Sequence, residues 1–178
     1  MAVKSKSNIK KRFFEVKAPL TSSKIALYAE SAEQLDGKVV KLDLTRSLKG
    51  KSFELKLKIK KEGEELIADP RSLWLSGSFI RRMIRNGIDY VEDSFMVECK
   101  DVKVVIKPFL ITRHKVSREV RKNLRNAARR HLENFIKLRT TKELFSEIMS
   151  NRVQKEMSLE LKKIYPLALC EIRVFEII

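Results

Sequence analysis

The residues with the clearest capacity for chemistry are the cations between Ser117 and Leu138. At about 100° per residue, a helix over this segment carries five of them on one side: Arg118, Arg121, Lys122, Arg125 and Arg129. The opposite side is apolar: Val120, Leu124, Ala127, His131, Phe135 and Leu138. Ser117 is a favourable N-cap, and Glu119 suits the positive first turn. Five like charges on one stripe repel one another unless an anion is present, so the pattern predicts phosphate contact rather than a merely solvated face.

The histidines and a group of carboxylates are candidates for catalysis, and the sequence disfavours both. His131 lies on the apolar stripe, where a neutral imidazole hydrogen-bonded in the core is usual, and His114 precedes the basic helix. Neither has a Ser, Cys or carboxylate at a spacing that suggests a catalytic arrangement. Five acids could form the metal site of a nuclease, but the solvated edge of a hairpin is a simpler interpretation: Asp89, Glu92, Asp93, Glu98 and Asp101. We expect no catalytic residue, no metal and no cofactor.

The first half of the chain predicts short extended segments. Apolar and charged residues alternate over residues 53–60, which predicts a half-buried strand. Its outer face presents three cations: Lys56, Lys58 and Lys60. A turn at residues 62–64 leads into the next segment, where Pro70 implies a strand edge or a break.

Two further local signals precede the basic helix. Asp36-Gly37 predicts a hairpin that joins residues 24–31 to residues 38–44. Residues 78–87 predict a short helix that ends at Gly87. Three cations lie on one side of it: Arg81, Arg82 and Arg85.

The second half predicts two long strands, a helical segment and a final strand. The strands cover residues 94–100 and 102–112, and the closing strand covers residues 167–177. Residues 140–164 are expected to be helical, beginning with a capping box from Thr140 to Glu143. Antiparallel strands followed by helices indicate an α+β fold with a curved or barrel-like antiparallel sheet flanked by helices, although an open sheet fits equally.

Length and charge constrain the class of protein. The chain has 178 residues, 43% hydrophobic, with 39 Lys plus Arg against 23 Asp plus Glu. The formal net charge of +16 comes mostly from residues 1–12 and 103–139. Such concentration is typical of a surface that binds a polyanion. We expect a basic arm over residues 1–12, disordered in the free protein and ordered on RNA, and a single RNA-binding domain over residues 13–178.

Cysteine usage and hydropathy bear on location. Cys99 and Cys170 lie in apolar segments without a second Cys or His at metal-ligand spacing, so we expect buried, reduced thiols. No apolar segment approaches the roughly 20 residues needed to span a bilayer, and no apolar signal-peptide core follows the basic start. We expect a cytoplasmic protein without a membrane or a small-molecule substrate as partner.

Zinc-finger spacing, aromatic RNA-recognition signatures, heptads and glycine-rich phosphate loops are absent. Phosphate and shape contact with folded RNA is therefore expected, and base stacking is not the obvious mode. The candidate RNA-binding residues are Lys4, Lys6, Lys10, Lys11, Arg12, Lys56, Lys58, Lys60, Arg81, Arg82, Arg85, Arg113, Lys115, Arg118, Arg121, Lys122, Arg125 and Arg129.

Four segments, in order along nearly the whole chain, resemble one known family. They are FFEVKAP (13–19), LDGKVVKLDL (35–44), ITRHKVSREVRKNLRNAARRHL (111–132) and KKIYPLALCEIRVFEI (162–177). Together they are similar to the archaeal and eukaryotic small-subunit ribosomal proteins called S three-Ae or S one-e. The resemblance implies a non-catalytic protein on the platform of the small subunit, near the messenger RNA exit and the 3′ region of the small-subunit ribosomal RNA. The short arm and the lack of a long basic C-terminal extension fit an archaeal form.

The resemblance implies three kinds of partner: small-subunit ribosomal RNA, neighbouring small-subunit proteins and, as a further candidate, messenger RNA near its exit. Three other functions compete with this one. A free-standing RNA- or DNA-binding regulator would show the same charge pattern. A metal-dependent nuclease would use carboxylates such as Asp93, and binding to an anionic membrane surface is the weakest alternative because the apolar stripe lacks the aromatic content of an interfacial anchor.

Overall fold

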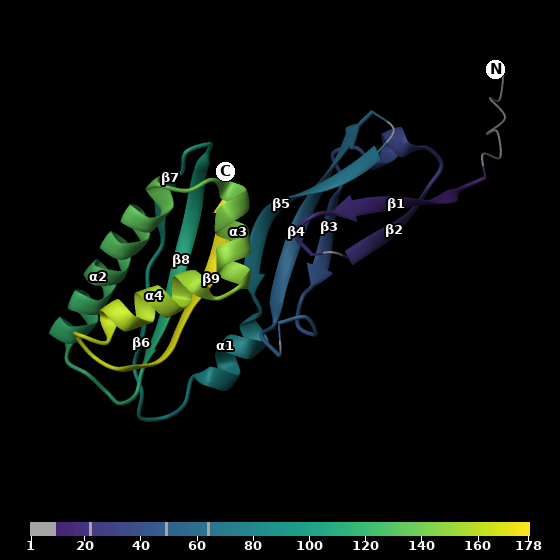
Figure 1. Cartoon of the computed structure of the whole chain (residues 1–178). Helices are drawn as coiled ribbons and strands as arrows, with labels where there is room; N and C mark the ends of the chain where they lie inside the picture. The colour runs from purple at the N-terminus through teal and green to yellow at the C-terminus, as the bar shows by residue number, and fades with distance from the viewer. Residues whose placement is uncertain (1–9, 22, 49, 64) are drawn as a thin grey trace, which may run out of the picture. The chain divides into compact units, whose positions relative to one another are not determined.

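The computed structural model describes residues 10–21, 23–48, 50–63 and 65–178. The described residues form two compact units, one within residues 10–40 and 57–70 and the other within residues 41–56 and 71–178. Figure 1 shows strands in both units and the α-helices in the second. The described part contains nine strands, four α-helices and one short 3₁₀ helix, so the expected α+β class is confirmed.

The first unit is built on a strand hairpin. Strand β1 (Arg12–Ala18) pairs antiparallel with β2 (Ser23–Ala29). Its other edge pairs with the beginning of β5 (Glu65–Leu75), where Val16 lies opposite Leu66. This pairing is parallel, so the expectation of an entirely antiparallel sheet is wrong. The described sheet is mixed and open, with β2 and β6 at the ends of its strand order, and not the barrel-like alternative.

Strand β4 (Phe53–Glu62) confirms the alternation read from the sequence. Its apolar side chains are buried, and it pairs with β3 (Val39–Asp43) and with β5. Gly63 has a φ of +63°, which a turn into β5 uses without strain. Pro70 lies in β5 between the residues that pair with β1 and those that pair with β9, so its missing N–H falls where the strand changes partner.

The hairpin expected at Asp36-Gly37 is wrong. The turn exists, with Gly37 at a φ of +74°, but a 3₁₀ helix, η1 (Ala32–Leu35), precedes it. Strand β3 pairs with β4 and not with β2. Gly37 N donates to Ile59 O at 2.9 Å, and Lys61 N donates to Asp36 Oδ1 at 3.2 Å. These contacts with a distant strand determine the pairing.

The sheet of the second unit centres on two long strands. Strand β9 (Leu167–Ile177) pairs antiparallel with the end of β5 and, along its length, with β8 (Lys103–Thr112). The other edge of β8 pairs with two short strands, β6 (Tyr90–Glu92) and β7 (Phe95–Glu98). Lys107 lies opposite Val174 and Pro108 opposite Ile172, so Arg173 is the extra residue of a β-bulge.

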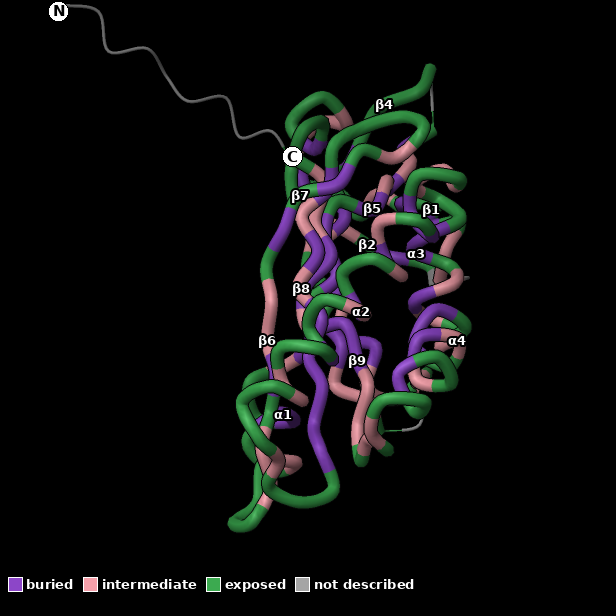
Figure 2. The backbone as a smooth tube through the Cα atoms, turned by 90° about the vertical axis from the view of Figure 1, so that its left-hand side faces the viewer, coloured by how far each residue is buried: buried purple, intermediate pink, exposed green. Residues whose placement is uncertain are grey.

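Three helices cover one face of this sheet: α2 (Arg118–Lys137), α3 (Thr141–Met149) and α4 (Arg152–Leu161). The rings of Phe145 on α3 and Phe175 on β9 pack edge to face, with their centres 4.9 Å apart. Figure 2 shows α3 and α4 on one side of β8 and buried residues along that strand. The core of this unit therefore lies between the helices and the sheet.

Two helix boundaries differ from the sequence expectation. The segment 140–164 is not one helix, because Asn151 takes a left-handed conformation, φ 61°, between α3 and α4. The expected capping box at Thr140 and Glu143 is present. Helix α1 (Gly77–Met83) ends four residues before Gly87, which forms a separate turn with a φ of +87°.

The two thiols are free and half-buried rather than fully buried. Burial, with a smaller contribution from Asp101, raises the pKa of Cys99 to about 11. Burial, with a smaller contribution from Glu171, raises the pKa of Cys170 to about 12. Both side chains are therefore neutral thiols in the ordinary pH range.

Candidate nucleic-acid interface

The basic helix α2 begins within a residue of its expected start. The Oγ of Ser117 accepts a hydrogen bond from Val120 N at 3.3 Å, as an N-cap should. Glu119 lies in the first turn, and Lys137 in the last, so both ends suit the helix dipole.

The loop before α2 is fixed by Asp89, which the sequence offered as a candidate metal ligand. Its Oδ2 accepts from Val116 N at 3.0 Å, and its backbone O accepts from Thr112 N at 2.9 Å and from Thr112 Oγ1 at 2.8 Å. These bonds attach the entrance of β6 to the end of β8. Arg113 and Lys115 are exposed on the loop that these hydrogen bonds hold in place.

The buried face of α2 is displaced from the apolar stripe expected from the sequence. The buried residues are Leu124, Ala128, Leu132, Phe135 and Ile136, whereas Leu138 is 69% exposed. At about 100° per residue, Leu132 and Ile136 fall on the same side as the cations. The cationic and buried faces are therefore adjacent, not opposite, in the C-terminal half of the helix.

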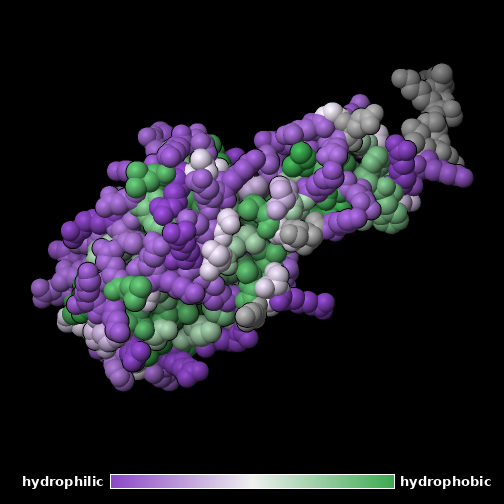
Figure 3. Space-filling model, in the orientation of Figure 1, coloured by the Kyte–Doolittle hydropathy of each residue, from purple (hydrophilic) through white to green (hydrophobic). Residues whose placement is uncertain are grey.

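Four cations of α2 surround a hollow of about 420 Å³ beside β6, which we name the α2 hollow. It is lined by Tyr90, Val91, Arg118, Arg121, Lys122 and Arg125. Tyr90 is 51% exposed, and Arg118, Lys122 and Arg125 are exposed. Figure 3 shows a mostly hydrophilic surface over α2. An exposed aromatic ring among cations suits a ligand with phosphates and bases.

Two of the predicted cations of the stripe are less free than the others, one through contacts and one through burial. Arg129 Nε donates to Glu133 Oε1 at 2.9 Å, and its guanidinium lies 5.1 Å from the centre of the Phe95 ring. The bond to Glu133 raises the pKa of Arg129. Arg121 is half-buried, and its Nε has no hydrogen-bond partner among the described residues. The freest cations of the stripe are therefore Arg118, Lys122 and Arg125.

The remaining predicted cations of the second unit lie on other elements. Arg81 and Arg82 are exposed on α1, where Arg82 lies 5.7 Å from the Phe79 ring centre, and Arg85 is exposed beyond its end. Lys56 on β4 lies 4.6 Å from the centre of the Trp74 ring. None of these four lines the α2 hollow.

The predicted cations of the first unit lie on β4 and at the start of β1. Lys58 is exposed, and Lys60 pairs with Asp69 Oδ2 at 2.8 Å, a hydrogen bond that raises its pKa. Lys10 and Lys11 are exposed before β1, and Arg12, its first residue, lies 4.8 Å from the Phe14 ring centre. Lys4, Lys6 and most of the expected arm lie outside the described residues.

The candidate catalytic groups have structural partners instead. Glu92 binds Arg173, and Asp101 Oδ2 accepts from Thr141 N at 3.3 Å. His131 is half-buried, and its Nδ1 contacts the carboxylate of Glu160 on α4. This contact joins α2 to α4. Over the described ranges, no three His, Cys, Asp or Glu side chains are arranged to hold a metal ion.

Among the described helices, none combines the length and apolar character needed to cross a membrane.

Comparison with known proteins gives consistent matches. The small ribosomal subunit protein eS1 of Nanoarchaeum equitans is 27% identical over 174 residues, which cover 93% of this chain and 88% of that protein. The protein of the same name from Methanothermobacter thermautotrophicus is 33% identical over 95 residues, 53% of this chain and 49% of that protein. The model of the Ribosomal S3Ae family matches residues 3–178. The chain therefore belongs to the Ribosomal S3Ae family and is a ribosomal protein rather than an enzyme.

Proposed function

We propose that the chain is a structural protein of the small ribosomal subunit that binds small-subunit ribosomal RNA. The α2 hollow carries this proposal, because it gathers exposed Arg118, Lys122 and Arg125 beside an exposed tyrosine on a chain of a ribosomal family. Both matched relatives bear the name of a small-subunit protein. The resemblance further suggests a place on the platform near the messenger RNA exit, with neighbouring small-subunit proteins and messenger RNA as partners.

The contacts at α2 are proposed to be with phosphates of folded RNA. Each cation that replaces a condensed counterion on a phosphate adds to affinity and to its salt dependence. Arg113 and Lys115 extend the cationic surface along the loop that Asp89 holds. The basic arm and the exposed cations of β4 and α1 are proposed as further contacts.

Salt titration of RNA binding tests the α2 contacts. The triple variant Arg118→Gln, Lys122→Gln and Arg125→Gln should flatten the slope of log K against log salt by about 2 to 3, because each lost phosphate contact removes about 0.7 to 0.9. We omit Arg121 and Arg129 because their side chains also pack in the fold. Filter binding to small-subunit ribosomal RNA provides the measurement, and circular dichroism verifies the helix.

A matched control removes the same charge elsewhere. Lys155, Lys162 and Lys163 are exposed in or just after α4, and their replacement by Gln also removes three positive charges. This control should change the slope by less than the α2 variant. Equal slopes in the two variants would mean that α2 faces solvent or another protein, and that other cations hold the RNA.

Sedimentation tests the ribosomal role itself. Stoichiometric recovery of the protein in small subunits from cell extract is expected, and crosslinks in those subunits should map to the platform. A pool only at the top of the gradient would contradict the proposal and favour a free-standing RNA- or DNA-binding regulator.

A further inference from the structure

A row of three side chains crosses the face of the second unit's sheet that lies opposite α3. Trp74 on β5 lies opposite Val174 on β9, and Val174 lies opposite Lys107 on β8. The next residue along β9, Phe175, meets Phe145 of α3 on the other face. Because side chains alternate between faces along a strand, the Trp74 row points away from α3. Trp74 is 38% exposed, unlike most large apolar residues of this unit.

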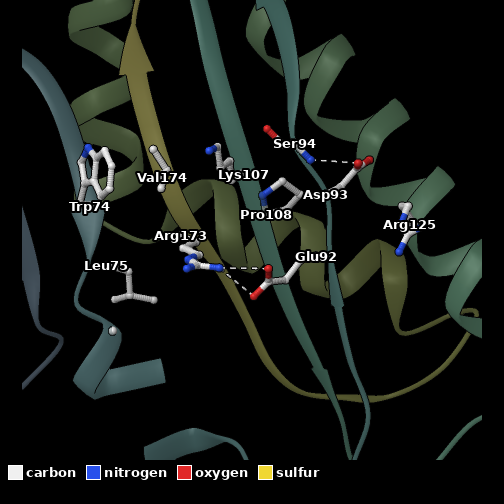
Figure 4. Close-up of a pocket in the computed structure, with 11 residues that line it drawn as sticks. Trp74, Leu75, Glu92, Asp93, Ser94, Lys107, Pro108, Arg125, Arg173 and Val174 are labelled. Atoms are coloured by element: carbon white, nitrogen blue, oxygen red, sulfur yellow. Dashed lines mark hydrogen bonds and ion pairs between the residues drawn. The ribbon is translucent and has the colours of Figure 1, made fainter. Parts of the chain in front are cut away.

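The row lies at a hollow of about 770 Å³, which we name the Trp74 hollow. Besides the row, Pro108, Arg173 and Arg125 line it. Figure 4 shows Trp74 at one side of this hollow and Arg125 of α2 at the other. The chain leaves β6 and enters β7 at Asp93 and Ser94, which also line the hollow. Its volume falls in the range of about 300 to 1,000 Å³ that is typical of sites for small ligands.

The charges of the Trp74 hollow separate into two groups. The bulge residue Arg173 is held by Glu92, with its Nη1 3.0 Å from each carboxylate oxygen. Asp93 accepts from the backbone N of Ser94 at 2.9 Å. Within the described part of the chain, neither Lys107 nor Arg125 pairs with a carboxylate, and Lys56 lies over the Trp74 ring. A ligand of this hollow therefore needs a flat apolar group to stack on the Trp74 ring and anionic groups to bind the cations. It also needs hydrogen-bond donors for the carboxylates.

We propose that the Trp74 hollow binds an unpaired RNA nucleotide, with its base stacked on Trp74 and its phosphates at Lys107 and Arg125. Stacking on an aromatic ring is open to every base, and a base edge offers N–H donors that carboxylates accept. An acidic peptide would satisfy the cations but would leave the indole ring without a flat partner.

This inference rests on the proposed RNA-binding function and adds a second mode to it. Arg125 lines both the Trp74 hollow and the α2 hollow, so one RNA strand can pass from one to the other. Folded RNA would contact the cations of α2, and a flanking unpaired nucleotide would stack at Trp74.

Tryptophan fluorescence tests the proposal directly, because Trp74 is the single tryptophan of the chain. A single-stranded RNA decamer of mixed sequence should quench the emission of the full-length protein on binding. A fully paired RNA hairpin, bound at equal occupancy by filter assay, should quench it much less. Equal emission with and without saturating single-stranded RNA would overturn the proposal and favour a protein contact at this hollow.

Variants separate stacking from charge. Trp74→Leu should weaken binding of the decamer by roughly 5- to 150-fold, whereas Trp74→Phe, which keeps a ring, should weaken it less. Tyr28→Leu, which removes an exposed ring of the first unit, is the matched control. Equal affinity in Trp74→Leu and the control, with intact circular dichroism, would contradict stacking.

A second variant separates this inference from the proposed function. Arg118→Gln with Lys122→Gln leaves Arg125 in place and should reduce hairpin binding while Trp74 quenching by the decamer persists. If hairpin binding is unaffected but quenching persists, the α2 contacts are wrong and the stacking site stands. If hairpin binding falls but no quenching occurs in the wild type, the stacking site is wrong and the α2 contacts stand.

Discussion

At the scale of single residues, one buried carboxylate contributes to the stability of the second unit. Glu171 is 3% exposed on β9. Its Oε1 accepts from Lys51 Nζ, and its Oε2 lies 3.4 Å from Gln154 Nε2. Lys51 also donates to Asn151 Oδ1 at 2.7 Å. A buried carboxylate is tolerated only with such partners, so Lys51 holds its loop to β9 and to the start of α4.

Removal of the amine should therefore destabilise the fold. Lys51→Met leaves Glu171 buried without its cation and should lower the free energy of unfolding by on the order of 3 kcal/mol. Urea denaturation gives the measurement. The double variant Lys51→Met with Glu171→Gln should recover part of the loss because no charge remains buried. A loss below about 0.5 kcal/mol in the single variant would indicate that water solvates Glu171.

The thiols should react slowly in the folded protein. With pKa values of about 11 for Cys99 and about 12 for Cys170, the thiolate is scarce at pH 8. Iodoacetamide should label the native protein at least about 100-fold more slowly than the unfolded chain, and Cys99 before Cys170. Mass spectrometry of timed samples measures this order. Equal rates in native and unfolded protein would show that the thiols open to solvent easily.

The raised pKa values of the two thiols also make the stability of the fold depend on pH. Above the ordinary thiol pKa of 9.0, the unfolded chain loses thiol protons that the folded protein keeps. Stability from this source is complete below pH 9 and falls as the pH rises through 11 and 12. Urea denaturation at pH 8 and pH 10.5 should show a smaller loss in the variant with both cysteines replaced by Ala. An equal loss in that variant would assign the effect to other groups.

At the scale of elements, the break between α3 and α4 shows how a single residue determines helix length. Asn151 has a φ of 61° and a ψ of 20°, which cost a residue with a Cβ about 1 to 2 kcal/mol unless its side chain bonds locally. The bond from Lys51 favours this conformation. The turn lets both short helices bury their apolar faces in the same unit.

Substitutions at Asn151 should separate the conformational contribution from the hydrogen bond. Asn151→Gly loses the bond to Lys51 but keeps access to the left-handed conformation, whereas Asn151→Ala loses both. The Ala variant should be less stable than the Gly variant by about 1 kcal/mol in urea denaturation. Equal stabilities would mean that the helices rearrange around the break.

Elements encoded by local pattern were predictable from the sequence, and elements that depend on distant contacts were not. The N-cap at Ser117, the alternation of β4 and the bounds of β9 all follow from neighbouring residues. The parallel pairing of β1 with β5 and the partner of β3 depend on residues far along the chain. Local periodicity carries no information on such pairings.

The candidate site shows the same division. The cations of α2 were found from helical spacing, whereas Tyr90 was missed because β6 has only three residues. Trp74 was also missed, since its exposure depends on how the helices pack against the sheet. The cations of the α2 hollow were predicted, but in the Trp74 hollow only Arg125 was, whereas Lys107 and Arg173 were missed. The aromatic rings of both hollows were missed as well.

At the scale of the whole molecule, the two compact units share strands. Strand β4 begins in the second unit and ends in the first, and β5 begins in the first and ends in the second. Neither unit can unfold completely without disrupting a strand of the other.

If the chain is a single domain, as expected from its sequence, calorimetry should detect a single unfolding event. The protein should unfold in one transition with equal calorimetric and van't Hoff enthalpies. Two resolved transitions would show that the strands uncouple where they pass between units. The variant Pro70→Ala tests the passage in β5 and should leave one transition in place.

The cationic stripe of α2 also has a consequence for how the free protein is handled. Its like charges repel one another, so dissolved salt should stabilise the unbound fold by screening them. The same salt should weaken the proposed RNA binding, because it opposes counterion release. If the proposed function holds, RNA is a ligand of the native state and should stabilise it by mass action. We therefore expect a chain made in excess of its RNA to depend on dissolved ions for screening of the stripe, and the RNA phosphates to take over that screening in the proposed complex.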